Sequence, residues 1–502
     1  MKARLASTGA LLLATAAASL LACGSDERLR PVGGEKGTAT LLHTISPSLS
    51  ENPRDQAFDA LEKDAFRREQ RFLDAAQPGY LFRSTVVPQA DIEAGFWTPG
   101  ELYEIGGQLF NTFFTRSVGF GARDLPPIAR FHTGRRGGPD ASRCASCHWR
   151  GGPAGAGDGA DSAFLDGDGN RQSSALARNP IALPGAGFVE IAAAEMTAEL
   201  AAARHALVEK ASASGKAERA ELRAKGVSFG HLTARPDGKV DTAELAGVDA
   251  DLVIKPFGWK GNVTTLRDAV EDALLIHHGM ESEYLVATAP PERIGPFGGA
   301  DPDGDGVTAE IREGQVTALT LFVALQEVPQ RVTPPDSNTA LMLADGQTRF
   351  VSLGCATCHV PSLTLESAKL TLPSRIGGTS VVVDLEKEGA EPRITRAKQD
   401  GSLQIFLFSD LKRHDMGKGL AEARADRGVA GNMFLTRPLW GVARSRPYLH
   451  DGRSPNLERA ILLHGGEAQS ARDAYAALPD PERGTVRVYL TTLTRAKRMV
   501  TQ

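Results

Sequence analysis

The sequence predicts a mainly α-helical protein in which two similar units follow one another, with loop-rich insertions. Three observations support this expectation. A short Cys-x-x-Cys-His motif occurs twice, apolar residues recur at helical intervals in several segments, and the stretches that follow the two motif copies resemble each other weakly. At 502 residues the chain is long enough for two or three domains, each with its own core.

The two motif copies are Cys144-Ala-Ser-Cys147-His148 and Cys355-Ala-Thr-Cys358-His359. This motif is the attachment sequence of c-type haem, in which two thiols bond to the porphyrin vinyl groups and the adjacent imidazole binds the iron. A zinc site would need two cysteine pairs near each other in the sequence, whereas these pairs are far apart. We therefore expect two covalently bound haem c groups, held in two cytochrome c-like domains in tandem.

Cysteine usage agrees with this interpretation. Four of the five cysteines belong to the two motifs, so no pair is left for a structural disulfide. The balance of 57 basic and 61 acidic residues gives no indication of a nucleic-acid partner.

The N-terminus predicts export. In residues 1–22, Lys2 and Arg4 precede an apolar run that is too short to span a membrane as a mature helix. Leu20-Leu-Ala-Cys23 has the form of a bacterial lipobox, which predicts acylation of Cys23; an ordinary signal with a chance cysteine is the alternative. We expect a lipoprotein of the cell envelope on the periplasmic face, in the outer membrane because no Asp follows Cys23 directly. Residues 23–95 would form a tether and a helical extension.

Residues 96–335 are expected to form the first cytochrome c-like haem domain, with a helical insertion. Glu101–Phe114 carries apolar residues at helical intervals, and Glu310–Ala324 would be the helix that closes the domain. Gly151–Asn170 is mostly Gly, Ala, Asp and Pro, which predicts a loop. Ile191–Gly226 is rich in Ala, Glu, Lys and Arg, which predicts a long helical stretch or hairpin.

One segment of this domain resembles a metal site. Asp301-Pro-Asp-Gly-Asp305-Gly resembles the start of a calcium-binding loop, so Ca²⁺ is a candidate second cofactor. Arg312 stands where the bidentate Glu of such a loop should be, and a solvated turn is the favoured alternative.

Residues 336–502 are expected to form the second cytochrome c-like haem domain. Val381-Val-Val383 favours a strand, but charged residues follow it, so we interpret this span as an insertion. Asn456–His464 predicts a helix that ends at Gly465-Gly466, and a ligand at such a helix end is held firmly.

The first half contains a weak copy of this last part. Phe257-Gly-Trp-Lys-Gly-Asn-Val-Thr-Thr265-Leu lines up with Tyr448-Leu-His-Asp-Gly-Arg-Ser-Pro-Asn456-Leu, and an apolar helix follows each. Without a gap, His464 falls opposite Ala273, and His277 lies one helical turn further along. The two halves look like copies of one haem-binding unit.

Four elements in Asp410–Glu467 point to a known family. They are His414-Asp-Met416-Gly, Pro438-Leu-Trp440-Gly, Tyr448-Leu-His450-Asp-Gly-Arg and His464-Gly-Gly-Glu-Ala. Together they resemble the di-haem oxidoreductases, also called thiol oxidoreductases. Asn179–Gly187 and Phe257-Gly-Trp-Lys260 resemble the first half of that family, so the resemblance covers about residues 100–495. The family is similar to the bacterial di-haem cytochrome c peroxidases and to the di-haem enzymes that mature quinone cofactors.

The resemblance implies a sixth iron ligand for the second haem. In the peroxidase relatives a residue in the helix after the Asp-Gly segment ligates the C-terminal haem, and here that residue is His464. The relatives commonly use Met there, so the histidine is a departure, and a helix-end histidine bonded to carbonyls is the alternative. Met416 is another candidate ligand, although packing against porphyrin is commoner for such a residue.

For the first haem the candidate sixth ligands are His277, His278 and Met280, and an open site is an equal alternative. If the site is open, the resemblance implies that Glu190 moves a proton between peroxide oxygens; a solvent-facing helix start is its alternative role. Trp259 and Trp440 are candidates for a position between the haems, with ordinary core packing as the alternative.

The function expected from these features is that of an exported di-haem oxidoreductase. One haem would receive electrons from a small donor protein, and the other would turn over peroxide or another small substrate. The rival interpretation is a non-enzymatic electron carrier, anchored to the envelope membrane by the lipid on Cys23, in which both irons are six-coordinate.

Overall fold

The computed structural model describes residues 85–114, 140–168, 171–288, 309–332, 336–394, 396–397 and 400–495. The predicted signal peptide with Cys23, residues 23–84 of the predicted tether and extension, and the predicted calcium loop Asp301–Asp305 lie outside these residues. Among the helices in the described ranges, none has both the length and the apolar character that crossing a membrane requires.

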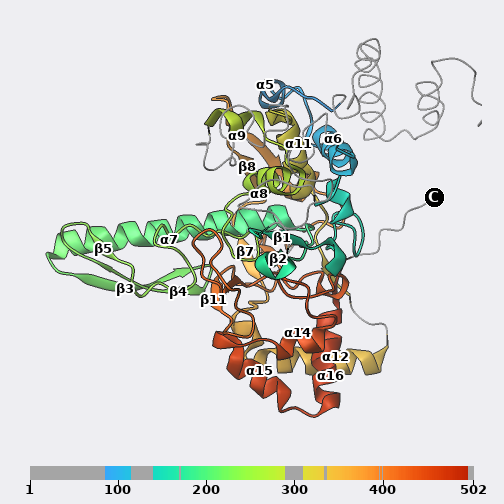
Figure 1. The fold of residues 1–502 in the computed structure, drawn as a ribbon. Helices are drawn as coiled ribbons and strands as arrows, with labels where there is room; N and C mark the ends of the chain where they lie inside the picture. Colours follow the sequence, from blue (N-terminus) through green and yellow to red (C-terminus); the bar gives the residue numbers. More distant parts are fainter. Residues whose placement is uncertain are drawn as a thin grey trace, which may run out of the picture. The chain divides into compact units, whose positions relative to one another are not determined.

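Two helix pairs with the same arrangement organise the chain (Figure 1). In the first half α6 (Pro99–Asn111) packs on α11 (Glu313–Ala324), and in the second half α12 (Ser337–Ser352) packs on α16 (Asp480–Thr491). α6 and α11 confirm the predicted helices near Glu101–Phe114 and Glu310–Ala324. Pro99 occupies the first position of α6, where its missing N–H has no helical partner to lose.

Each pair crosses at a glycine. A Cβ atom on Gly106 would lie 2.1 Å from the Ala318 carbonyl oxygen, and one on Gly346 would lie 2.0 Å from the Thr485 carbonyl oxygen. Only a residue without a side chain allows the two backbones to approach so closely.

An aromatic residue follows each crossing glycine by one helical turn. Phe110 packs against Phe322 with ring centroids 4.9 Å apart, and Phe350 packs against Tyr489 at 5.4 Å. The two halves therefore share a helix crossing built from the same kinds of residue at the same spacing.

The predicted correspondence between the segments after the two motifs is confirmed in their backbone. A single antiparallel bridge joins Phe257 to Val263, and another joins Tyr448 to Ser454. Inside these turns the second residue has a φ of 74° in both copies, as Gly258 and as Leu449. The fifth residue is a glycine with positive φ in both copies, 59° in the first and 68° in the second.

The helices after these turns begin in the same way. α8 (Leu266–Ala273) has Thr265 as its N-cap and α14 (Leu457–Leu462) has Asn456, and each side chain accepts from the backbone N–H three residues later. The first copy then differs, because a π-helical turn over Leu274–His278 continues α8. Such turns are frequent at functional sites.

The prediction of a mainly α-helical fold is only partly correct, since the described residues form a mixed α/β structure with small antiparallel sheets. The strands with their pairings are β1 (Ala163–Leu165) with β2 (Leu176–Arg178), β7 (Leu363–Leu365) with β10 (Leu403–Ile405), β8 (Lys369–Leu372) with β9 (Val381–Asp384), β11 (Arg413–Asp415) with β12 (Met433–Leu435), and β6 (Gln330–Arg331) with β13 (Leu493–Thr494). The remaining helices are α5 (Gln89–Glu93), α9 (Glu283–Thr288), α13 (Leu385–Glu388) and α15 (Gln469–Ala476).

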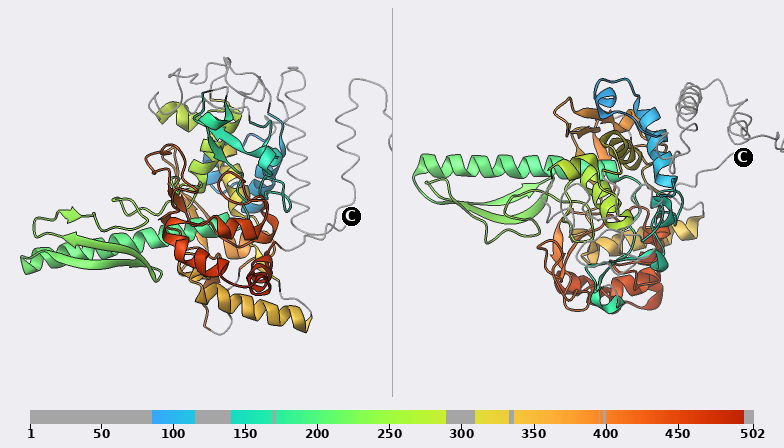
Figure 2. Two further views of the ribbon diagram at one scale, coloured as in Figure 1. Left: turned by 60° about the horizontal axis from the view of Figure 1, so that its bottom comes forward. Right: turned by 45° about the horizontal axis from the view of Figure 1, so that its top comes forward.

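The segment Ile191–Gly226 shows why the structure contains less helix than the sequence predicts. α7 (Ala186–Ser214) is the predicted long helix, but a three-stranded sheet of β3 (Glu218–Ala224), β4 (Val227–Ala234) and β5 (Val240–Asp241) follows it. Its first strand consists of good helix formers, yet its residues alternate between more and less exposed, and Lys225-Gly226 forms a two-residue hairpin turn with positive φ at both positions. In both views of Figure 2 the sheet lies along the outer part of α7.

The glycine crossing gives a stability prediction. Gly106→Ala should lower the free energy of unfolding by about 1–3 kcal/mol, because the new methyl group collides with the α11 backbone. Gly100→Ala in the same helix is the matched control, since a Cβ there meets only the Thr98 hydroxyl at 4.0 Å, and it should be neutral or slightly stabilising. Urea denaturation followed by circular dichroism measures both; equal effects of the two changes would contradict the close crossing.

Candidate functional site

The two Cys-x-x-Cys-His motifs have the same backbone conformation. Cys144–Ser146 and Cys355–Thr357 each form a 3₁₀ turn. The following histidine closes the turn by donating its N–H to the carbonyl of the first cysteine, at 3.1 Å for His148 and 3.0 Å for His359. All four thiols are half-buried and outside any disulfide, and burial raises the pKa of the first cysteine of each motif, to about 12 and about 11 respectively. The first thiol of each motif is therefore protonated, and all four are available to bond to a cofactor.

Both motif histidines are fixed in the same tautomer. Nδ1 of His148 donates to the Gly155 carbonyl at 3.2 Å, and Nδ1 of His359 donates to the Phe408 carbonyl at 3.1 Å. Because a carbonyl only accepts, the proton is on Nδ1 and the lone pair is on Nε2. Burial lowers the pKa of both imidazoles to about 4, so both are neutral. A neutral imidazole held through Nδ1 is the form that ligates a metal through Nε2.

The aromatic residue of each helix crossing lies beside the motif histidine. The ring centroids of Phe110 and His148 are 6.1 Å apart, those of Phe350 and His359 are 6.5 Å apart, and the interplanar angle is 45° in both pairs. The helix crossings thus position the two motifs in the same way.

One cavity of about 720 Å³ is lined by both motifs. Its walls are mostly apolar, and they include the side chains of Trp259 and Trp440. The two motifs, 211 positions apart in the sequence (355 − 144), therefore face the same internal space, which is the arrangement expected for two cofactors that exchange electrons. A large apolar cavity with few polar groups is typical of a cofactor site.

His464 lies at the cavity wall, just beyond the end of α14. Its Nδ1 donates to the Ala460 carbonyl at 2.8 Å, and burial lowers its pKa. The imidazole is thus neutral with its lone pair on Nε2, as in the two motif histidines. The carbonyl contact expected for a helix-end histidine is therefore present. It uses only Nδ1, so Nε2 stays available to a metal. Met416 lines the same cavity.

The π-helical turn gives the three candidate ligands near the first motif, His277, His278 and Met280, different surroundings. His277 lines the cavity, and its Nδ1 lies 2.5 Å from the Asp140 carboxylate. His278 is buried instead against Ala141, whose carbonyl accepts its Nδ1–H at 2.8 Å, and its Nε2 lies 3.7 Å from the Cys144 sulfur. Met280 is fully buried and does not line the cavity. Of the three, the geometry favours His277.

Glu190 has a structural contact that accounts for its position. It is 7% exposed on α7, and its carboxylate accepts the Leu266 N–H at 2.6 Å, at the start of α8. Burial raises its pKa to about 7. The alternative of a solvent-facing helix start is wrong, and Glu190 is not among the cavity-lining residues, so its proton-transfer role stays a prediction.

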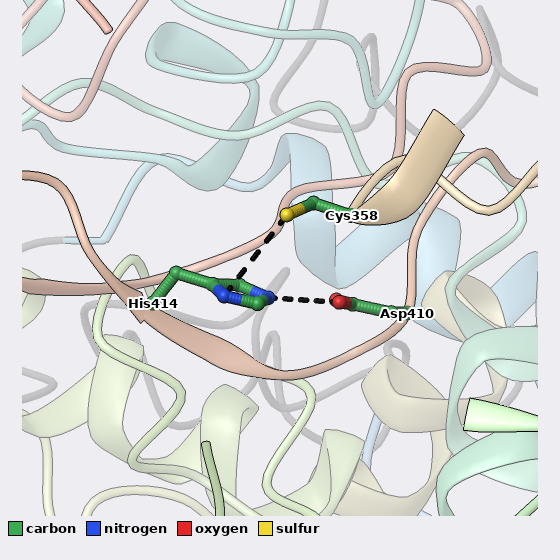
Figure 3. A group of neighbouring side chains, drawn as sticks. All are labelled: Cys358, Asp410 and His414. Carbon is green, nitrogen blue, oxygen red and sulfur yellow. Dashed lines mark hydrogen bonds and ion pairs between the residues drawn. The ribbon is translucent and has the colours of Figure 1, made fainter. Parts of the chain in front are cut away.

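His414 is held between the carboxylates of Asp410 and Glu467 beside the second motif, and Figure 3 shows its contact with Asp410. Its Nε2 lies 2.8 Å from Asp410 and its Nδ1 lies 2.7 Å from Glu467. Burial opposes the charged form, but Asp410 and then Cys358 outweigh it and raise the pKa of His414 to about 11. His414 is therefore an imidazolium that donates to both acids.

Cys358, Asp410 and His414 lie close enough together to hold a metal ion (Figure 3). An imidazolium that donates from both nitrogens has no lone pair for a metal. Cys358 is also a member of the second motif. The group fits a charged hydrogen-bond network better than a metal site.

Three of these residues carried no prediction from sequence. Asp140 and Asp410 are isolated acids in the sequence, although Asp410 precedes His414 by four residues. Arg437 lines the cavity as well, and a signal for it was present, because it is a cation within the otherwise uncharged Phe434–Trp440 stretch. His450, named within a motif, stacks on Phe434 and also lines the cavity.

Residues 298–493 match the family model described as "Di-haem oxidoreductase, putative peroxidase". Over these residues, which are less than half of the chain, the protein resembles the di-haem oxidoreductase family. The match contains the second motif, His414 and His464, and the resemblance expected from the sequence is confirmed there. A haem redox function follows for the chain, with haem as its cofactor.

A hydrazine synthase of Kuenenia stuttgartiensis, solved under xenon pressure, is similar over 41% of this chain and 66% of its own, with 17% identity and a TM-score of 0.24. No curated protein sequence matches the chain. The residues described above fit haem in a di-haem oxidoreductase, because two neutral imidazoles and four thiols face one apolar cavity.

The charge of His414 gives a pH-dependent prediction. Its folded-state pKa is raised above the ordinary 6.5, so its stabilising effect is complete below pH 6.5 and is lost as the pH rises toward 11. His414→Gln should cost about 2–4 kcal/mol at pH 6. The difference from the unaltered protein should shrink above pH 6.5, by at most about 1.4 kcal/mol per pH unit. Urea unfolding at pH 6 and pH 8 measures this; an equal cost at both values would show that His414 is neutral.

Proposed function

We propose that the chain is an exported di-haem c-type cytochrome in which one haem transfers electrons and the other turns over peroxide or another small substrate. The single cavity lined by Cys144, Cys147 and His148 together with Cys355, Cys358 and His359 supports this proposal most directly. In this proposal each motif belongs to a cytochrome c-like unit, and the repeated helix crossings and turns are the shared framework of the two units.

Covalent attachment is supported by the chemistry of the four thiols. They lie outside any disulfide, and each pair is followed by a histidine with its lone pair on Nε2. When bound, haem supplies an iron that changes its charge by one electron and can bind a small ligand at an open position. His148 and His359 are the proximal ligands in this assignment.

We assign His464 as the sixth ligand of the second haem. Its Nδ1–H is fixed by Ala460, and it lines the cavity wall that it shares with His359. After burial, the nearby His464 is a further cause of the lowered pKa of His359, which supports this assignment. A haem held on both faces by protein ligands favours electron transfer over substrate binding.

We assign the first haem to substrate turnover, with His277 as the group that moves a proton. His277 lines the cavity, its Nδ1 faces Asp140, and a third of its side chain is exposed, so a proton can pass between the carboxylate, the ring and the solvent. Glu190, on α7 beside the start of α8, remains an additional candidate acid. Trp259 and Trp440 line the same cavity as both motifs, which supports a path for electrons through them. Trp440 lies directly on Gly185, where any side chain would collide with the indole.

The rival function, a non-enzymatic carrier, is favoured by the same histidine. Nδ1 of His277 paired with a carboxylate is also the arrangement of a metal-ligating histidine, and both haems would then be six-coordinate. The two functions therefore differ in what His277 does.

Other parts of the proposal rest on the sequence alone. They are export, lipid anchoring through Cys23 to the outer membrane, a small electron-donor protein as partner, and a Ca²⁺ ion between Asp301 and Asp305.

Electron paramagnetic resonance tests the enzymatic assignment. The oxidised protein should show one low-spin haem and one high-spin haem, and one equivalent of hydrogen peroxide should remove the high-spin signal. Two low-spin signals that peroxide and cyanide leave unchanged, in the mixed-valence state as well, would contradict enzyme activity and favour the carrier.

Two histidine variants locate the signals. His464→Ala should convert the low-spin haem to high spin, because it removes the proposed sixth ligand. His277→Ala should keep both spin states and slow the reaction with peroxide by about 10²–10⁴-fold. A change of spin state in His277→Ala would instead identify His277 as an iron ligand.

Cysteine variants test the covalent attachment. Changing both cysteines of either motif to alanine should leave one covalent haem per chain by mass spectrometry and haem staining. Cys23→Ala is the control, which should keep two haems and lose the lipid. Two haems in a motif variant would contradict attachment through that motif.

A further inference from the structure

Arg437 is a cation inside the cavity without an acidic partner. No ion pair among the described residues includes it, and its guanidinium donates only to the Pro256 and Gly258 carbonyls, both at a long 3.4 Å. Burial lowers its pKa to about 10. The side chain remains charged at neutral pH, and its accessible surface faces the cavity that it lines.

The other shielded arginines at this cavity are neutralised. Arg150 pairs with Asp158, Arg178 with Glu422 and Asp426, Arg427 with Asp272, and Arg495 with Glu327. A buried charge is costly unless an opposite charge and hydrogen bonds compensate it. The exception at Arg437 therefore points to an anion that occupies the cavity.

The backbone holds Arg437 at the junction of the two haem-binding halves. On one side the Thr436 N–H donates to Lys412 at 2.8 Å, and on the other the Leu439 N–H donates to Leu407 at 2.9 Å. Its carbonyl acceptors belong to the turn around Gly258 in the first half, and its charge lies 6.0 Å from the Trp259 ring. The cation is thus fixed where these segments of the first and second halves meet.

A carboxylate is the anion that this arrangement fits. The planar guanidinium binds a carboxylate through two parallel hydrogen bonds, and the weak carbonyl contacts leave donors for that purpose. Haem carries two propionate carboxylates, and the cavity walls around Arg437 are mostly apolar. We propose that Arg437 binds a propionate of one of the two haems and raises the reduction potential of that haem.

The direction of the effect follows from charge. Reduction adds an electron to the iron, and a nearby fixed cation favours the more negative, reduced state. This inference depends on the proposed attachment of two haems, so haem content is measured on the same samples.

The test compares Arg437→Gln with Arg219→Gln in the complete haem-loaded protein, by spectroscopic redox titration of both haems. Arg219 is the control because it carries the same charge on β3, half-exposed and outside the cavity. In Arg437→Gln one haem should show a roughly tenfold lower ratio of reduced to oxidised form at a fixed potential, a fall of about 59 mV for one electron. Arg219→Gln should leave both potentials unchanged.

Two unchanged potentials in Arg437→Gln, with two haems present by mass, would overturn the role of Arg437 and leave the proposed function intact. Fewer than two covalent haems in the unaltered protein would instead contradict the proposed function. Arg437 could instead bind a free carboxylate from solution. Acetate would then shift the haem potentials of the dialysed unaltered protein but not those of Arg437→Gln. That result would also overturn the proposal.

If Arg437→Gln does not accumulate with haem, Arg437→Lys carries the test. Lysine keeps the charge but cannot form two parallel hydrogen bonds. In Arg437→Lys the ratio of reduced to oxidised haem at a fixed potential should change less than threefold. The propionate bending band in the resonance Raman spectrum should nevertheless shift. An unchanged band in Arg437→Lys would overturn the proposal.

Discussion

The hydrogen bonds from Nδ1 of His148 and His359 to main-chain carbonyls are the interactions on which the candidate site depends. They fix the tautomer and the orientation of each imidazole, and burial keeps both rings neutral. The helix crossings at Gly106 and Gly346 serve the same geometry, because each places an aromatic ring beside one of these histidines. A helix pair that separated by the width of a methyl group would move that ring and loosen the site.

The two halves share this framework and differ where their chemistry is proposed to differ. After the common turn and N-cap, α14 ends and presents His464, whereas α8 continues into a π-helical turn that presents His277 beside Asp140. The first arrangement leaves a neutral imidazole at a helix end, and the second joins an imidazole to an acid. One backbone design therefore supports two environments, which suits a protein with one haem for electron transfer and one for substrate.

The sequence was sufficient where local pattern decides structure. The motif turns, the helices at Glu101 and Glu310 and the correspondence of Phe257 with Tyr448 all depend on short-range features, namely cap residues, glycines and helical spacing. The composition of β3 favours a helix, but the alternation of exposed and less exposed residues and the Lys225-Gly226 turn make it a strand. The partners of the site came from tertiary contacts: Asp140 meets His277 and the carbonyl of Gly258 meets Arg437 only after distant segments fold together.

The central claim is that two haems share one cavity and exchange electrons directly within the chain. Pulse radiolysis that delivers less than one electron per molecule tests this, with the absorbance of each haem followed in time. Direct exchange predicts a first-order redistribution between the haems whose rate is independent of protein concentration. A rate that rises with protein concentration, or no redistribution, would contradict the account.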